Sequence, residues 1–266
     1  MDDALDALRF FTNSVNRVLV FEALSEGVTT GSTLAEKSGA SRSTVARILD
    51  AGESRGWIAS EGSHYELTNA GQIMFDEVRG CLETIEGIQN IGEPINLLPR
   101  PARSLDYRSF RDAEIITGSS ANPAEPFDNV AERIRDANRV RTLAWTGVPR
   151  LTKLIDEQAM TGTLDCEAVM QADFFQTLEG RPEAASHWRA PAERAEVWLY
   201  DGNIPLSLHI IDETVVIWLG DPQGDEVVVH GAFISNDPSV RSWAESIYEE
   251  YRANATKLDP ARLPHH

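Results

Sequence analysis

Apolar side chains recur at helical spacing along the first fifty-odd residues of the chain, in segments that glycines separate. The spacing predicts helices over residues 4–25, 32–38 and 41–55. Asn13 or Ser14 offers a capping side chain within the first segment, which indicates that this segment contains two helices. The beginning of the chain is therefore predicted to be mainly helical.

Two short strand-like runs follow these helices. Residues 57–59 and 65–67 flank the polar pair Gly62 and Ser63, and this arrangement predicts a small hairpin. A long helix is then predicted over residues 68–95, because its apolar positions keep helical spacing. The Leu-Leu-Pro-Arg-Pro segment that comes next breaks the helix and is typical of a linker.

From about residue 105 the pattern changes, and strand-like apolar runs alternate with amphipathic helical segments. The predicted strands cover residues 113–117, 140–146, 164–171, 196–200, 206–211, 214–219 and 226–234. The predicted helices cover residues 127–137, 149–161, 173–189 and 237–255. Strand–helix units followed by consecutive strands predict an α/β sheet with helices on its faces.

Residues 33–49 meet the local requirements of a helix-turn-helix, which needs a small side chain in its first helix, a tight turn and a capped second helix. Ala35, Gly39 and Ser41 supply these features in order. The second helix of this motif places its N-terminal residues against base edges in the major groove. The residues predicted to contact double-stranded DNA are Ser41, Arg42, Ser43, Thr44 and Arg47 in this helix, and Ser63 and His64 at the hairpin tip.

Two arginines carry most of the predicted DNA chemistry. Arg42 and Arg47 each fit either a bidentate contact to guanine or a clamp on a phosphate group, and both interpretations stay open for Arg47. A winged helix used only for protein contacts is the alternative. The local charge argues against that alternative, because residues 37–55 hold four basic and two acidic side chains.

The stretch from residue 13 to residue 71 resembles the winged helix-turn-helix of archaeal and bacterial regulators. The resemblance rests on Leu-Ala-Glu from residue 34, Ser-Arg-Ser-Thr-Val from residue 41, Gly-Trp-Ile from residue 56, and Tyr-Glu-Leu-Thr-Asn-Ala-Gly from residue 65. In such families the last of these motifs leads into a helix that often forms dimers. The apolar face of the helix over residues 68–95 is long for a simple linker, so we expect a homodimer.

The net charge of the chain changes this picture. Its formal value is −18, although DNA-binding surfaces are normally basic. Only three of the 24 basic residues are lysines, and this scarcity beside 42 acidic residues resembles the proteins of haloarchaea that live at molar internal salt. At that salt concentration the Debye length is about 3 Å, so an acidic surface does not repel DNA at range. The alternative to this halophilic interpretation is an ordinary acidic protein, for which we would not expect DNA binding as strongly.

Other features limit the location and the chemistry. The chain has no apolar run of about 18 residues and no basic stretch leading into an apolar core at its N-terminus, so we expect a cytoplasmic protein without a membrane span. Cys81 and Cys166 fit no metal or redox spacing. Phosphate-binding glycine loops and a nucleophile elbow are missing, and His209 and His230 are interpreted as structural side chains. No cofactor and no metal is therefore predicted.

A ligand site is predicted where a strand of the second half ends. Ligands of open α/β sheets bind beyond the carboxyl ends of the strands, and a helix N-terminus favours anions. The candidate ligand-binding residues are Trp145, Thr146, Arg150 and Gln171. In the alternative interpretation, Trp145 packs in the core and Arg150 pairs with a surface acid.

The domain order resembles archaeal regulators of a methanogenesis-regulator-like and TrmB-like type, on stretches such as Phe-Arg-Asp-Ala-Glu from residue 110 and Trp-Ala-Glu-Ser-Ile-Tyr from residue 243. This resemblance implies a sensor domain related to the phospholipase-D-like fold. The nucleases of that fold need a His-x-Lys pair. His187, His209 and His230 each lack a lysine two residues on, which disfavours a nuclease.

The predicted fold class is α+β in three parts: a winged helix-turn-helix domain over residues 1–68, a connecting helix and linker over 69–104, and an α/β regulatory domain over 105–259. The predicted function is sequence-specific regulation of transcription by a homodimer whose DNA binding responds to a small, anionic metabolite. A ligand-independent repressor or architectural DNA binder is the alternative, and an enzyme with a DNA-binding appendage is less favoured.

Overall fold

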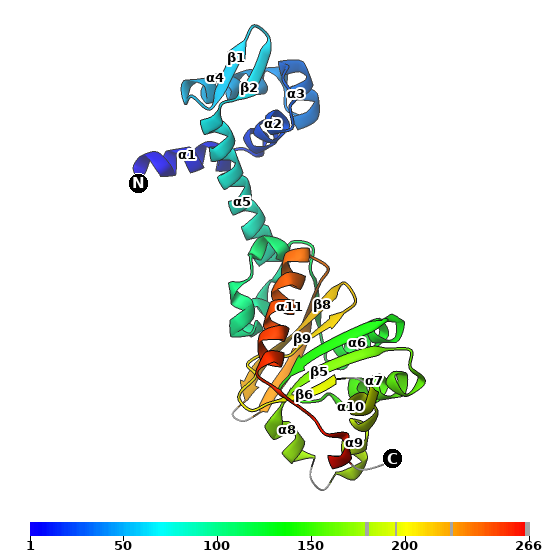
Figure 1. Ribbon diagram of the computed structural model, residues 1–266. Helices are drawn as coiled ribbons and strands as arrows, with labels where there is room; N and C mark the ends of the chain where they lie inside the picture. The colour runs from blue at the N-terminus through cyan, green and yellow to red at the C-terminus, as the bar shows by residue number, and fades with distance from the viewer. Residues whose placement is uncertain (179–180, 195, 224–225, 264–266) are drawn as a thin grey trace. The chain divides into compact units, whose positions relative to one another are not determined.

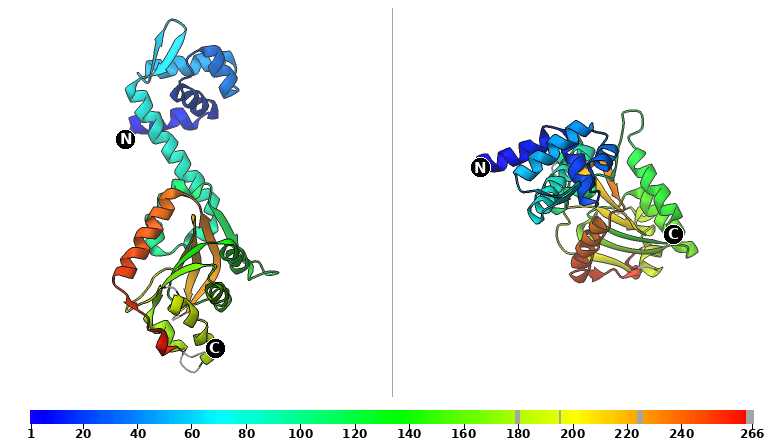
Figure 2. Two further views of the ribbon diagram at one scale, coloured as in Figure 1. Left: turned by 45° about the vertical axis from the view of Figure 1, so that its right-hand side comes forward. Right: turned by 90° about the horizontal axis from the view of Figure 1, so that it is seen from above.

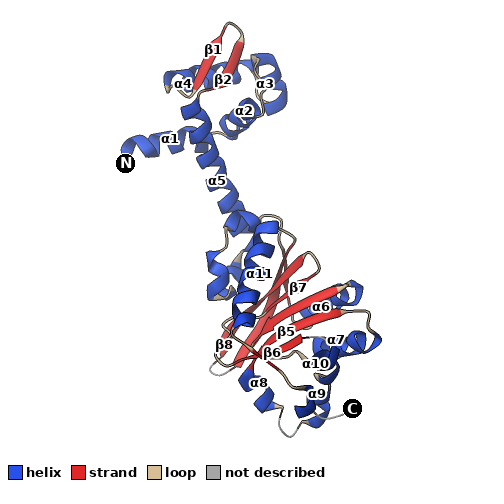
Figure 3. Cartoon of the chain, viewed as in Figure 1, coloured by secondary structure: helices blue, strands red, loops and turns tan. Residues whose placement is uncertain are grey.

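The computed structural model describes residues 1–178, 181–194, 196–223 and 226–263. The chain divides into two compact units, Met1–Ile85 and Glu86–His266. Both helices and strands occur, as the predicted α+β class requires (Figure 3). The assignment of separate roles to residues 1–68, 69–104 and 105–259 stays a prediction.

The first unit consists of four helices, a hairpin and the beginning of a long helix (Figure 1). Its elements are α1 Asp2–Thr12, α2 Val15–Ser25, α3 Gly31–Ser38, α4 Arg42–Ser54, β1 Ile58–Glu61, β2 His64–Leu67 and α5 Asn69–Ile91. Ser14 is the N-cap residue of α2, which confirms the predicted break within residues 4–25. Helix α5 begins in this unit and ends in the second.

An aromatic cluster holds the first unit together. Phe11 and Phe21 are almost completely buried and their ring centroids lie 5.0 Å apart, while the Trp57 ring stacks on Phe11 at 5.6 Å. Such rings bury large apolar areas, worth about 1.5–3 kcal/mol for each fully buried side chain. A Cβ atom at Gly71 would lie 1.9 Å from the Trp57 carbonyl oxygen, so only glycine allows α5 to pack this closely on the hairpin.

The second unit is built on an eight-stranded mixed sheet with the order β10-β6-β5-β4-β7-β8-β9-β3. The strands are β3 Glu114–Thr117, β4 Arg139–Ala144, β5 Asp165–Gln171, β6 Glu196–Tyr200, β7 Leu208–Ile211, β8 Thr214–Gln223, β9 Glu226–Ser235 and β10 Thr256–Lys257. Strands β4, β5 and β6 are parallel, and the other pairs are antiparallel. Strand–helix units followed by consecutive strands were predicted from the sequence, and only the very short β10 was not.

Helices cover both faces of this sheet (Figure 2). The helices are α6 Glu125–Asp136, α7 Pro149–Thr161, α8 Ala172–Thr177, α9 Pro182–Ser186, α10 Arg189–Arg194 and α11 Pro238–Ala253. Helix α11 packs on one face, where its Tyr248 joins the cluster that includes Leu143. Helices α6 and α7 pack on the other face, around Val140. The two faces follow from the alternation of side chains along β4.

Two predicted helices differ from the structure. The prediction of a single helix over residues 173–189 is wrong: the described part of this segment contains α8, α9 and the first residue of α10, with residues 179–180 outside the description, and Pro182 starts a new helix. The helix predicted to reach residue 95 ends at Ile91, because Gly92 has φ +60° and ψ −141° and the chain continues as the 3-10 helix Glu93–Leu97. In the part of the chain that the structure describes, no helix combines the length and the apolar character needed to cross a lipid bilayer.

Candidate functional site

Helices α3 and α4 form a helix-turn-helix whose geometry follows from a few residues. Gly39 ends α3 in the left-handed region, with φ +66°, and allows the sharp turn. Leu34 of α3 and Val45 of α4 are almost completely buried in the same apolar cluster, so the two helices share one core. The opposite side of the beginning of α4 is exposed.

Hydroxyl groups gather at the N-terminus of α4. Ser41 is the N-cap residue, and its Oγ accepts a hydrogen bond from the backbone N–H of Thr44 at 3.2 Å. The same oxygen lies 2.9 Å from Thr44 Oγ1 and 3.0 Å from Ser43 Oγ. Ser41 therefore has a capping role that stabilises α4 in addition to any contact with DNA.

Arg42 and Arg47 are exposed on α4. Within the part of the chain that the structure describes, neither forms an ion pair with an acidic side chain. Among the other basic residues of this unit, Lys37 pairs with Glu26 and Arg55 with Asp6, whereas the exposed Arg9 forms no ion pair in the described part of the chain. The two predicted DNA-contacting arginines thus keep their positive charge unneutralised.

The hairpin tip predicted as the wing is short. Gly62 has φ +65° and forms the two-residue turn with Ser63, and Glu61 pairs with His64 across it. Ser63 and His64 are exposed. A bridge between Thr30 and His64 ties β2 to the residues before α3. The hairpin is therefore fixed against the helix-turn-helix, although the exposed Glu61 makes it less suited to phosphate contacts than α4.

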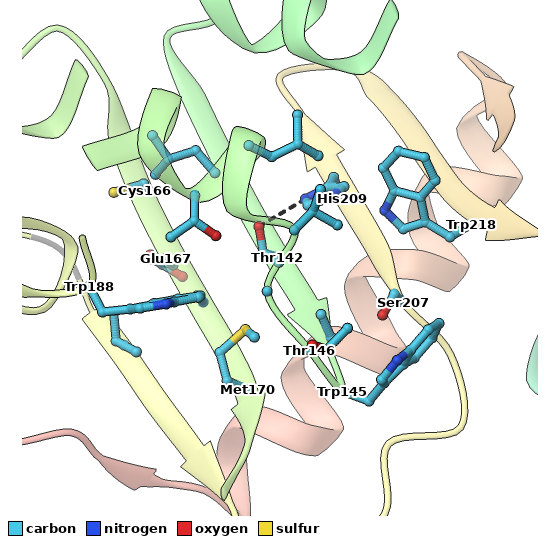
Figure 4. A pocket seen from close by; sticks show the side chains of 18 of the residues that line it. Thr142, Trp145, Thr146, Cys166, Glu167, Met170, Trp188, Ser207, His209 and Trp218 are labelled. Atoms are coloured by element: carbon cyan, nitrogen blue, oxygen red, sulfur yellow. Dashed lines mark hydrogen bonds between the residues drawn. The ribbon is translucent and has the colours of Figure 1, made fainter. Parts of the chain in front are cut away.

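A cavity of about 60 Å³ lies in the second unit, where β4 ends and α7 begins (Figure 4). Residues of strands β4 to β9 line its sheet side, mainly those of β4 and β5, and the loop after β4 and helix α7 contribute the other lining residues together with Trp188. Trp145 and Thr146, both predicted to bind a ligand, line this cavity. Their role in ligand binding stays a prediction.

The other two predicted ligand residues are not in the cavity lining that the structure describes. Arg150 forms an ion pair with Asp128 of α6, as the alternative interpretation of its side chain held. The Gln171 side chain accepts a hydrogen bond from the Ile204 backbone N–H at 3.0 Å and so holds the chain before β7. Arg150 and Gln171 therefore do not belong to the same site as Trp145 and Thr146 in this structure.

The cavity also contains polar residues that the sequence analysis did not select. Thr142 of β4 and His209 of β7 are opposite each other in the antiparallel register, and Thr142 Oγ1 and His209 Nδ1 share a hydrogen bond at 2.9 Å (Figure 4). Burial lowers the pKa of His209 to about 4, so the ring is neutral at pH 7. Ser207 lies two residues before His209 and on the same side of the strand. The sequence gives no sign that His209 lies at a cavity, because its surroundings depend on which strand pairs with β7.

The fold thus defines a protein with a winged helix-turn-helix unit and a mixed α/β unit that contains a cavity. Residues 5–90 match the family described as HVO_A0261 N-terminal domain, and residues 123–254 match the middle domain of the methanogenesis regulatory protein FilR1. The chain therefore combines a domain of the HVO_A0261 N-terminal type with a domain of the FilR1 middle-domain type.

Three solved structures with low sequence identity resemble parts or most of this chain. TrmBL2, an archaeal chromatin protein, is 14% identical with a TM-score of 0.40, over 95% of this chain and 99% of that one. The phospholipase D family member Nuc from Salmonella typhimurium is 14% identical with a TM-score of 0.43, over 55% of this chain and 99% of that one. NucT from Helicobacter pylori is 15% identical with a TM-score of 0.42, over the same shares of the two chains. No curated protein matches the sequence.

Proposed function

We propose that this regulator binds double-stranded DNA sequence-specifically, through the N-terminal half of α4 with the hairpin tip as a secondary contact. The observation that carries the proposal is the pair of exposed, unneutralised arginines, Arg42 and Arg47, on the second helix of a helix-turn-helix. A recognition helix of this motif contacts base edges with its first turns. The exposed Asp50 on the next turn limits the favourable surface to the first half of α4.

The chemistry of this surface supports recognition of base edges as well as phosphates. An arginine fork donates two parallel hydrogen bonds to guanine or to a phosphate group. The N-terminus of a helix adds a partial positive charge, and the hydroxyls of Ser43 and Thr44 add donors and acceptors. With only a few basic groups, the surface makes few phosphate contacts, so its affinity depends less steeply on salt than that of a strongly basic protein.

DNA duplexes enriched from a random-sequence library provide the test. We expect Arg42→Ala to weaken binding to the enriched duplex by about 1–3 kcal/mol, measured by fluorescence anisotropy, and to relax the sequence preference. Arg79→Ala is the matched control, because Arg79 lies in the same unit and is already paired with Asp76. Equal affinity of the Arg42→Ala variant and the Arg79→Ala control would contradict the proposed interface.

We also propose that the DNA-binding form is a dimer with a second copy of this chain. Along α5, Ile73, Cys81 and Ile85 are exposed at intervals of four or eight residues and therefore form one ridge. Leu5 and Leu8 of α1 are also exposed, at 42% and 44%. A two-fold dimer would cover such apolar side chains and would present two recognition helices to two half-sites.

The dimer has a direct test. We expect light scattering at high salt to give twice the chain mass for the wild-type protein, and the monomer mass for Ile85→Glu, which places a charge on the ridge. A bifunctional maleimide should also link two copies through Cys81. A monomeric wild-type protein, with and without DNA, would refute the dimer.

The function proposed for the second unit is to sense a small molecule. The cavity at the carboxyl end of β4 supports this proposal, because α/β sheets bind ligands there. A ligand changes DNA binding only if it binds the DNA-competent and the DNA-free states with different affinity. Titration of the enriched duplex with and without a cavity ligand separates a ligand-responsive regulator from a ligand-independent DNA binder.

A further inference from the structure

The walls of the cavity in the second unit are mostly aromatic and apolar. The indole rings of Trp188 and Trp218 line it together with Met170 and Ala168 (Figure 4), and Trp145, another lining residue, also packs against the core cluster that includes Leu143, as the alternative interpretation held. Apolar walls with a few polar groups are typical of small-molecule sites. A water molecule needs about 10–15 Å³, so a cavity of about 60 Å³ has room for several waters or for a small organic molecule.

One polar group at this cavity lacks a partner. Ser207 is only 5% exposed, and its Oγ has no hydrogen-bond partner in the part of the chain that the structure describes. The Ser207 backbone is fixed, because its carbonyl oxygen accepts a hydrogen bond from the Trp218 N–H at 3.0 Å. Buried hydroxyls are almost always hydrogen-bonded, so this one is available to a molecule inside the cavity.

A second polar position, the hydrogen-bonded pair of Thr142 and His209, lies on the same face of the sheet. His209 Nδ1 is engaged by Thr142, which leaves Nε2 as the other polar atom of the ring. Both side chains are uncharged at pH 7. They offer hydrogen-bonding atoms without an ionic attraction.

The cavity contains no positive charge that would hold an anion. Among the lining residues that the structure describes there is no lysine and no arginine. The one acidic residue, Glu167, is already bonded to Arg139 at 2.8 Å and to the Tyr248 hydroxyl at 3.3 Å. A buried carboxylate or phosphate without a cationic partner costs several kcal/mol. An anionic ligand therefore does not fit this cavity.

We propose that the cavity binds a small, uncharged organic molecule with an apolar body and a hydroxyl or carbonyl oxygen that hydrogen-bonds to Ser207. This inference rests on the sensing function proposed above and names the chemical class of its ligand. The indole rings and Met170 contact the apolar body, and Ser207 fixes the orientation through its unpartnered Oγ. The class differs from the anionic metabolite that the sequence predicted.

A size-matched pair of probes tests the charge of the ligand. Trifluoroethanol and trifluoroacetate have similar volumes, and only the second is charged at neutral pH. In ¹⁹F NMR titrations of the full chain we expect saturable binding of trifluoroethanol, with a dissociation constant on the order of 1 mM for so few atoms. We expect no saturable binding of trifluoroacetate. Equal or tighter binding of trifluoroacetate would overturn the proposal, as would the lack of trifluoroethanol binding.

Two variants test whether trifluoroethanol binds inside the cavity. Ser207→Ala should weaken trifluoroethanol binding about fivefold, the loss of one ordinary hydrogen bond, while the melting temperature stays equal or rises because an unpartnered buried hydroxyl is removed. Ala168→Leu fills the cavity and should abolish binding. Ser186→Ala is the matched control: Ser186 is a buried serine outside the cavity lining that donates to the Glu183 carbonyl, so its loss should lower the melting temperature and leave probe binding unchanged.

The binding of trifluoroethanol to the cavity can be measured independently of DNA binding. The Arg42→Ala variant, which is expected to lose DNA affinity, should bind trifluoroethanol like the wild-type chain. If the wild-type chain binds the enriched duplex but Ser207→Ala and Ala168→Leu bind trifluoroethanol normally, the cavity inference fails and the DNA-binding proposal stands. If the probe binds as expected but no duplex is enriched, the DNA-binding proposal fails and the cavity assignment stands.

Discussion

The N-terminus of α4 allows fold stability and DNA contact to be separated by two substitutions at one residue. Ser41 caps the helix through its Oγ, which accepts from the Thr44 N–H at 3.2 Å, and it is exposed toward the proposed DNA surface. Ser41→Ala removes the cap. Ser41→Asp keeps a capping oxygen, because aspartate caps helices as well as serine does, but it adds a negative charge.

The magnitudes follow from this geometry. Loss of a serine N-cap costs about 1 kcal/mol of helix stability, whereas Ser41→Asp should change it by only a few tenths, because its charge also interacts favourably with the helix dipole. At the DNA surface the order is reversed. A carboxylate in contact with the phosphate backbone costs several kcal/mol, because the two negative charges repel each other. Ser41→Asp should therefore weaken DNA binding by roughly tenfold or more.

Hydrogen exchange and anisotropy measure the two effects separately. Exchange of the amides of α4, followed by mass spectrometry, should be about fivefold faster in Ser41→Ala and close to wild type in Ser41→Asp, since about 1.4 kcal/mol corresponds to a factor of ten. Anisotropy with the enriched duplex should show the larger loss in Ser41→Asp. If Ser41→Asp binds the duplex as tightly as the wild-type chain does, the beginning of α4 does not face DNA and the proposed interface is refuted.

Three further predictions concern the accessibility of the two cysteines, the acid stability of the second unit and the packing of α5 in the first. A maleimide should label the exposed Cys81 quickly in the native chain and leave Cys166 unlabelled until unfolding, as mass spectrometry would show, because Cys166 is buried and burial raises the pKa of its thiol to about 12. Acid should destabilise the second unit through His209: its pKa of about 4 in the fold lies below the ordinary value of 6.5, so this contribution is complete above pH 6.5 and is lost as the pH falls toward 4, and His209→Gln should flatten that part of the melting-temperature profile. Gly71→Ala should lower the stability of the first unit by about 1–3 kcal/mol in denaturant titrations, because its Cβ meets the Trp57 carbonyl oxygen, whereas unchanged stability would show that α5 can shift away.

The local elements were largely predictable from the sequence because local rules determine them. The helix boundary at Ser14, the side-chain cap at Ser41 and the glycine turn at Gly39 lie where the residue types predicted them, although the Ser14 side chain makes no capping hydrogen bond. The prediction for residues 173–189 failed because the apolar spacing there is compatible with one helix or with several short ones. Tertiary packing decides between the two. Local signals determine caps and turns more strongly than they determine helix length.

The cavity was only partly predictable, for a physical reason. Trp145 and Thr146 follow a strand end, and a strand end is visible in the sequence. Ser207 and His209 lie more than sixty residues further along the chain, and their place in the cavity depends on the antiparallel pairing of β7 with β4. Apolar alternation in a single strand does not reveal which strand it pairs with or in which register.

The charge of the chain and the proposed interface are consistent once ion pairing is considered residue by residue. A net charge of −18 opposes DNA binding only where acidic groups lie near the phosphates. In the second unit, arginines such as Arg139 and Arg141 are paired with carboxylates of β5 and α11 and add no free positive charge. Arg42 and Arg47 have no such partner in the described chain, so they place unneutralised positive charge at the beginning of α4. Because that surface is small, high salt should weaken the repulsion from the remaining acidic surface more than it weakens the direct arginine contacts.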